Sequence, residues 1–308
     1  MNKLVREFQA QFSPLIFDER VFERIDNAAK LHEETKCHPL SSCAACLNVI
    51  GSVATDPAEL IKFLGFFGLN IEELYEFKPP LTFEGITYQD TSFVIFEWIG
   101  PKESPINEAG GGRGYSRTSV DAFLLGKIDG KITQILIEWK FTEGFHRDIA
   151  LGKFSGGQGV ERLRRYSVVL ARLRKKRDLV FEFENDDLPK SGPPIGLYDL
   201  SPDHLYQLLR MTLLGKMTTG KRLGERIIED YHIVHLTHSQ NDGINVLHPE
   251  YLKLSPGLQR FSGRGLHEVW RELLSSGERE RFTHGHWDQA INLLGNSDLR
   301  EYLFDRYV

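Results

Sequence analysis

The sequence lacks several features that would assign it at once to a class of protein. Three cysteines are too few, and odd in number, for a disulfide framework. No uninterrupted apolar run approaches the ~20 residues of a membrane-spanning helix. Residues 1–12 have no apolar stretch of the kind found in a signal peptide. We therefore expect a protein of the reducing cytoplasm with no membrane partner.

The chain also lacks an excess of positive charge. Its 38 Lys and Arg residues face 43 Asp and Glu residues, which gives a formal net charge of -5. This balance excludes a protein coated in positive charge, but it leaves room for a local basic patch that contacts nucleic acid. Hydrophobic residues make up 41% of 308 residues, which is enough to bury a sizeable core.

Changes in hydrophobic period divide the chain into three parts that we expect to form one compact unit. Residues 1–80 read as a helical part, in which Asp56 caps a helix and Pro57 fits its first turn. Residues 81–240 combine strands and helices and read as an α/β core. Residues 241–308 read as a helical C-terminal extension.

Within this frame the sequence predicts individual elements. Asn70 is expected to cap a short helix through Leu74. The strands are predicted at residues 92–98, 118–125, 132–141 and 231–236, with a hairpin turn at residues 128–131. After Gly159 a helix is predicted whose inward face contains Val160, Leu163, Ser167, Leu170 and Leu173. Another helix is expected to start at Ser201-Pro202.

Two of these strands carry charged residues in an apolar setting. Side chains alternate along a strand, so Glu138 and Lys140 project from one face. The other face consists of Ile135, Ile137 and Trp139. A hairpin brings Asp121 from the partner strand beside Glu138. Exposed charges at a sheet edge are the plain alternative, but charges in so apolar a strand need a partner or a metal.

This trio has a chemical use. Mg²⁺ prefers oxygen ligands, and Asp121 and Glu138 supply carboxylates that can hold it against a phosphate. Such an ion polarises the phosphoryl oxygen and acidifies a bound water. Lys140 can orient that water and offset developing charge. We therefore predict a Mg²⁺ site, with Mn²⁺ as a substitute.

The pattern of an Asp followed by Glu-x-Lys on hairpin strands resembles the PD-(D/E)XK nuclease superfamily, in particular bacterial restriction-endonuclease-like proteins. Val120 replaces the usual proline before Asp121. The further similarities span roughly residues 39–236, and they comprise Ser41-Ser42, Thr118 to Ala122, Thr142-Glu143, and Tyr206 to Arg210. The resemblance implies a mixed sheet flanked by helices, with helical N- and C-terminal additions. It further implies a metal-dependent DNA endonuclease, and many such nucleases act as homodimers.

Three further polar residues are candidates for the site. Glu108 either adds a carboxylate to the metal site or is a loop residue, and Glu143 has the same two readings. Gln207 either reaches a phosphate or the attacking water from its helix, or is a helix-surface amide. We count Glu108 among the candidate metal ligands and Gln207 among the candidate catalytic residues.

Basic residues suggest where nucleic acid binds. The glycine-rich run at residues 110–114 reads as a flexible loop beside the site, from which Arg113 and Arg117 are expected to contact a nucleic-acid backbone. Eight Arg or Lys residues lie between residues 161 and 177. They are either a solvated helix face or a duplex contact that gains affinity by counterion release, with Arg162, Arg165 and Arg172 as the candidates.

Cysteine and histidine patterns are read as structural. Cys37, Cys43 and Cys46, with His32 or His38, fit no strong zinc or iron–sulfur spacing, so buried thiols are expected. The same holds for His232, His235, His238, His284 and His286, because no carboxylate-rich pattern accompanies them.

Three functions compete at this point. The leading one is a Mg²⁺-dependent DNA endonuclease of restriction or repair type. The second is a non-catalytic module that retains the nuclease fold to bind nucleic acid or protein, although retention of Asp121, Glu138 and Lys140 disfavours it. The third is a phosphoesterase for small nucleotides, disfavoured because no clear nucleotide-binding loop is present.

Overall fold

The central hairpin forms where the sequence predicts it. Asp129 and Gly130 both adopt positive φ, which a two-residue turn between twisted strands requires. The turn joins β5 (Val120–Ile128) to β6 (Lys131–Trp139), and the two strands pair antiparallel along their length. Strand β9 (Asp230–Thr237) then pairs parallel with β6. These strands are confirmed, with shifts of one to three residues at their ends.

Our computed structural model of the chain describes residues 15–29, 31, 38, 40–89, 92–109, 117–143, 152–185, 193–250, 252–253 and 255–308. Six strands form one mixed sheet in the order β1-β5-β6-β9-β10, with β4 also paired to β5. The remaining strands of this sheet are β1 (Ile71–Leu74), β4 (Ile95–Trp98) and β10 (Phe282–His286).

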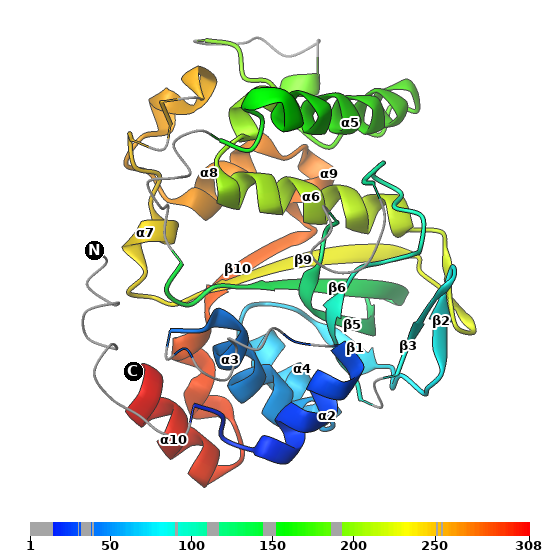
Figure 1. Cartoon of the computed structure of the whole chain (residues 1–308), viewed down its shortest axis with the longest axis vertical. Coiled ribbons are helices and arrows are strands. Elements are labelled where there is room, and N and C mark those ends of the chain that lie inside the picture. Colours follow the sequence, from blue (N-terminus) through cyan, green and yellow to red (C-terminus); the bar gives the residue numbers. More distant parts are fainter. Residues whose placement is uncertain are drawn as a thin grey trace.

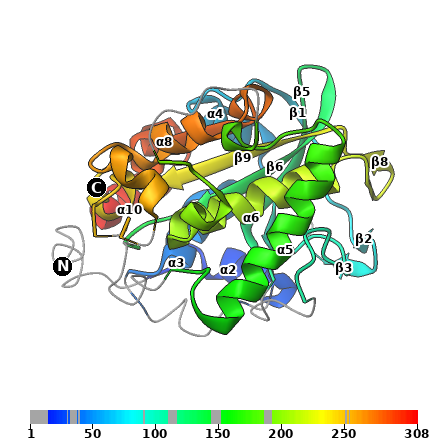
Figure 2. The same cartoon turned by 90° about the horizontal axis from the view of Figure 1, so that it is seen from above.

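Helices cover both faces of the sheet (Figures 1 and 2). One face carries α5 (Gly156–Lys175), α6 (Asp203–Thr218), α8 (Leu266–Leu273) and α9 (Ser276–Arg279). The other carries α2 (Glu19–Ala29), α3 (Ser42–Cys46), α4 (Pro57–Gly65) and α10 (Ser297–Tyr307). The mixed sheet between helices is the expected architecture.

Shorter elements complete the described chain. Two small hairpins consist of β2 (Leu81–Phe83) with β3 (Ile86–Tyr88), and β7 (Arg222–Leu223) with β8 (Arg226–Ile227). Helix α7 spans Asp242–Asn245, and short 3₁₀- or π-helical segments lie at Leu47–Gly51, Glu182–Glu184, Leu197–Leu200, Pro256–Phe261 and Trp287–Leu293. Within the described ranges, no helix is both long and apolar enough to cross a membrane.

Alternation along β6 divides the core into two layers. Ile135, Ile137 and Trp139 pack with the helices α2, α3, α4 and α10. Leu136 packs on the opposite side, in the core beneath α5, α6 and α8. The predicted apolar face of this strand is therefore confirmed, and Glu138 lies in the position that faces α6.

Helix α6 packs closely against the sheet. A Cβ on Gly215 would lie 2.5 Å from the ring of Tyr231 on β9, so only glycine permits this approach. Gln134 on β6 donates to the Gly215 carbonyl at 2.8 Å. These contacts fix the distance between α6 and the strand that carries Glu138.

Some local predictions were wrong. Residues 71–74 form strand β1 rather than a short helix, because they pair with the end of β5. Residues 282–286 form β10, parallel to β9, within a tail that was expected to be helical. In both cases pairing with the sheet outweighs local propensity. The N- and C-terminal parts thus each add a strand to the core sheet.

Helix α5 is rotated relative to its predicted face. Val160 is 63% exposed, whereas Tyr166, Val169, Leu170 and Leu173 are buried. The aromatic ring of Tyr166 lies closer to the middle of the buried stripe than the short Val160 side chain near the helix start. This rotation decides which basic side chains of α5 point toward α6.

Candidate active site

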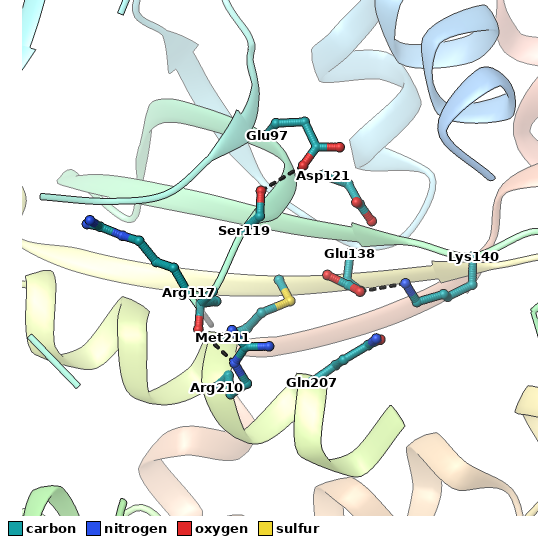
Figure 3. Close-up of a pocket in the computed structure, with 10 residues that line it drawn as sticks. Glu97, Arg117, Ser119, Asp121, Glu138, Lys140, Gln207, Arg210 and Met211 are labelled. Atoms are coloured by element: carbon teal, nitrogen blue, oxygen red, sulfur yellow. Dashed lines mark hydrogen bonds and ion pairs between the residues drawn. The ribbon is translucent and has the colours of Figure 1, made fainter. Parts of the chain in front are cut away.

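The predicted hairpin brings Asp121 beside Glu138. Ala122 pairs with Ile137, so the same register places Asp121 directly opposite Glu138. The Asp121 Oδ2 atom accepts a hydrogen bond from the Trp139 N–H at 2.7 Å. Figure 3 shows the two carboxylates close together on neighbouring strands.

Lys140 follows directly after β6 and turns back toward Glu138. Its Nζ lies 2.6 Å from Glu138 Oε1, and both side chains are at most 10% exposed. Its backbone is held on two sides, because its N–H donates to the Leu236 carbonyl at 2.8 Å and its carbonyl accepts from Trp287 Nε1 at 3.0 Å. The ammonium is therefore positioned by the sheet and by the C-terminal part together.

Burial gives this pair unusual electrostatics. Burial raises the pKa of the Glu138 carboxyl, against the opposing effect of Lys140. Desolvation lowers the pKa of Lys140, but attraction to Glu138, Asp121 and Glu143 outweighs it, and the net shift is upward. Because this carboxyl is costly to ionise, any additional cation that enters the pocket stabilises its ionised form.

These residues line a pocket of about 290 Å³. Its walls are Glu97, Arg117, Thr118, Ser119, Asp121, Glu138, Lys140, Gln207, Arg210 and Met211. Gln207, on α6, faces the strand residues across it (Figure 3). Its Oε1 atom is buried without a hydrogen-bond partner in the described chain. The structure thus brings Gln207 to the same pocket as Asp121, Glu138 and Lys140.

Glu97 is a pocket residue that our sequence reasoning missed. It lies on β4 beside Asp121 and accepts a hydrogen bond from Ser119 Oγ at 2.7 Å. Its φ of 54° is uncommon for a residue with a side chain, and such strain is often found at functional sites. The signal was available, because Glu97 is the charged residue within the apolar run at residues 93–98.

Glu108 lies elsewhere than the metal-ligand prediction required. It does not line the pocket, and its carboxylate accepts from the Thr118 N–H and Oγ1, each at 2.7 Å. It also accepts from Tyr166 at 3.1 Å and from Arg210 Nε at 3.0 Å. With Ser104 Oγ at 3.5 Å, five donors surround this buried carboxylate, so it ties the start of β5 to α5 and α6.

The arginines predicted to contact nucleic acid differ in exposure. Arg113 and the glycine-rich run lie outside the described residues. Arg117 is only 6% exposed, and its guanidinium donates to the Ile99 carbonyl at 3.0 Å and the Lys102 carbonyl at 2.8 Å. Of the three residues on α5, Arg172 is exposed, whereas Arg162 and Arg165 are partly buried and point toward α6.

The residues that carry the family resemblance form supports for the site. Ser42 Oγ donates to the Trp139 carbonyl at 3.0 Å, between Glu138 and Lys140. Thr142 donates to the Leu40 carbonyl at 3.0 Å. Arg210 donates to Thr118 Oγ1 at 2.9 Å. Glu143 accepts from the Phe141 N–H at 2.8 Å and so stabilises the chain just after Lys140.

The described cysteine and histidine side chains range from buried to exposed, and Cys43 is half-buried rather than buried as predicted. Cys46 is buried, and desolvation raises its pKa well above the ordinary value, so the thiol stays protonated. His235 and His267 are buried and hydrogen-bonded to each other at 2.9 Å. Cys37 and His32 lie outside the described residues.

The pocket chemistry suits a hard cation, but the ligands are not preassembled. Glu97, Asp121 and Glu138 offer the oxygen donors that Mg²⁺ prefers. Among the residues that the structure describes, no three His, Cys, Asp or Glu side chains are already clustered as ion ligands. Lys140 holds Glu138 instead, so an ion entering the pocket would share or displace that contact.

Comparison with known protein families places the chain in one of them. A family model described as "Restriction Endonuclease associating with ARP" matches residues 9–308. The chain therefore belongs to this restriction-endonuclease-like family. Comparisons with curated proteins and with solved structures gave no match.

Proposed function

We propose that this member of the family of restriction endonucleases associating with ARP is a metal-dependent endonuclease that hydrolyses DNA phosphodiester bonds. The observation that supports this most directly is the convergence of Asp121, Glu138 and Lys140 in one pocket. A cytoplasmic location and a homodimer remain predictions.

Each side chain has a defined task in this proposal. Asp121 and Glu138, with Glu97 as a further donor, would hold Mg²⁺ or Mn²⁺. A divalent ion supplies Lewis-acid polarisation of the phosphoryl oxygen and acidifies a water. The Lys140 ammonium, 2.6 Å from Glu138 Oε1, would orient a water and offset charge on the phosphoryl oxygens. Gln207, whose Oε1 atom has no hydrogen-bond partner in the described chain, would accept a hydrogen bond from a water in the pocket.

The test is cleavage of plasmid DNA by purified protein with Mg²⁺ or Mn²⁺. Asp121→Asn and Lys140→Ala are expected to abolish cleavage. Asp129→Asn and Lys127→Ala are matched controls, because they make the same changes at the far end of the hairpin. Equal cleavage by wild type and Asp121→Asn protein would reveal a contaminating nuclease and refute the assignment.

One observation favours the alternative of a non-catalytic binding module. The Glu138–Lys140 ion pair neutralises the buried carboxylate without a metal. DNA binding without cleavage in Mg²⁺, Mn²⁺, Ca²⁺ or Zn²⁺ would support that alternative over the nuclease.

A further inference from the structure

A second pocket, of about 310 Å³, borders the candidate active site. The start of α5, the residue Lys153 before it, and α6 form its walls. Arg210 lines both pockets, so they lie on adjoining sides of one turn of α6. We call this second cavity the α5–α6 pocket.

The α5–α6 pocket is rich in cationic side chains. Lys153, Arg162, Arg165 and Arg210 line it, and Glu161 is the acidic residue in the wall. The Glu161 carboxylate is itself engaged by the exposed Arg164, at 3.1 Å from its Nε. The wall therefore has an excess of positive charge that Glu161 does not balance.

Two of these four cations, Arg162 and Arg165, have no ion-pair partner among the described residues, and the other two do. Lys153 pairs with Asp203 at 3.1 Å and Arg210 pairs with Glu108 at 3.0 Å. In the part of the chain that the structure describes, neither Arg162 nor Arg165 forms an ion pair. Arg162 donates only to neutral oxygens, and the Nε atom of Arg165 is buried without a hydrogen-bond partner there.

The start of α5 adds to this field. The helix is 20 residues long and its first turn contains no acidic residue. Among the residues that the structure describes, the Ser155 side chain finds no capping hydrogen bond, and a Cβ at Gly156 or Gly157 would meet no atom within 4 Å. Gln158, in the same turn, lines the pocket. Helix N-termini of this kind favour anions through their free N–H groups and dipole.

We propose that the α5–α6 pocket binds a second phosphate group of the nucleic-acid strand, beside the phosphate held in the active-site pocket. That this phosphate belongs to a nucleic acid rests on the proposed function. Guanidinium groups match phosphate oxygens in a bidentate geometry, and Arg165 provides the unpaired donor. Arg210, shared by the two pockets, links the positions of the two phosphates. The group is either an internal phosphodiester or a terminal phosphomonoester.

The experiment measures binding of DNA 12-mers, single-stranded and duplex, that carry fluorescein on an internal thymine base, by fluorescence anisotropy in EDTA. Arg165→Gln is compared with Arg174→Gln, which removes the same charge from the exposed far end of α5. We expect Arg165→Gln to weaken binding about tenfold, and Arg174→Gln less than about threefold. Arg162→Gln provides a second reading if Arg165→Gln does not fold.

Three results would overturn the phosphate site in the α5–α6 pocket. Equal losses in Arg165→Gln and Arg174→Gln would mean diffuse attraction to α5 and would overturn the pocket. Wild-type affinity in both Arg165→Gln and Arg162→Gln would overturn it as well, as would failure of the wild type to bind any of the oligonucleotides.

Oligonucleotides with a 5′-phosphate, a 3′-phosphate or neither distinguish the two sources of the group. Tighter binding of a phosphorylated end, lost in Arg165→Gln, assigns a terminal phosphomonoester. Equal binding of all three, weakened alike by Arg165→Gln, assigns an internal phosphodiester. The binding assay contains no metal, so selective weakening by Arg165→Gln supports the phosphate pocket whether or not the protein cleaves DNA. Absence of cleavage would refute only the proposal of a nuclease.

Discussion

Replacement of Glu108 by glutamine distinguishes a structural carboxylate from a metal ligand. The Glu108 side chain is 1% exposed and receives five hydrogen bonds, including one from Arg210, whose side chain is 19% exposed. Removing one member of a buried ion pair typically costs about 3–5 kcal/mol. Glutamine keeps one acceptor oxygen and Arg210 keeps its 2.9 Å bond to Thr118, so we expect about 3 kcal/mol, the lower end of that range.

Urea unfolding measures this loss, and calorimetry with Mn²⁺ measures metal affinity. Glu108→Gln protein that remains folded is expected to bind Mn²⁺ with unchanged affinity. Glu97→Gln is the matched control, because it neutralises a partly exposed pocket carboxylate and keeps the hydrogen bond from Ser119. We expect it to lower metal affinity by about tenfold or more and stability by less than about 0.5 kcal/mol. A Glu108→Gln protein of normal stability that has lost Mn²⁺ binding would refute this reasoning.

Three further predictions concern stability. Lys216→Met removes the 2.7 Å partner of the buried Glu278, which keeps Arg281 at 3.4 Å, so it should cost about 3 kcal/mol in urea unfolding, the lower end of the range for a broken buried pair. A cost below about 1 kcal/mol would contradict the buried pair. Desolvation holds the pKa of His267 well below its usual 6.5, so on acidification the unfolded state takes up the proton first and His267 destabilises the fold below pH 6.5. Between pH 7.5 and 5.5, the free energy of unfolding of His267→Gln should therefore fall by about 1 kcal/mol less than that of the wild type. An equal or larger fall in the variant would contradict a depressed pKa of His267. Gly159→Ala should cost about 1–3 kcal/mol, because its Cβ would lie 2.2 Å from a carbonyl carbon of the preceding loop. Gly157→Ala, with open space around its Cβ, should stabilise α5 by up to about 1 kcal/mol, and thermal melts that rank the two variants the other way would refute this.

Local chemistry made the centre of the site predictable. The turn at Asp129-Gly130 sets the register of the hairpin, and the two-residue period of a strand places Glu138 on the face opposite Ile137. Two short-range rules therefore predict that Asp121 meets Glu138. The same rules, applied to the apolar run at residues 93–98, would have drawn attention to Glu97.

Contacts between distant segments could not be predicted in this way. Whether Glu108 binds a metal or Arg210 depends on where α6 lies, 102 residues further along the chain. The rotation of α5, which turns Arg165 toward α6 and leaves Arg172 in solvent, follows from the packing of Tyr166. Strand β10 forms only because β9 offers an edge with which it can pair.

The sequence by itself determined the trio of Asp121, Glu138 and Lys140, because strand period and turn geometry act between near neighbours in the chain. Tertiary structure decided the partners of that trio. It excluded Glu108 from the pocket, added Glu97, and placed a cationic cavity on the other side of Arg210. Those positions depend on how helices pack against both faces of one sheet, where the free energy comes from burial shared among many segments.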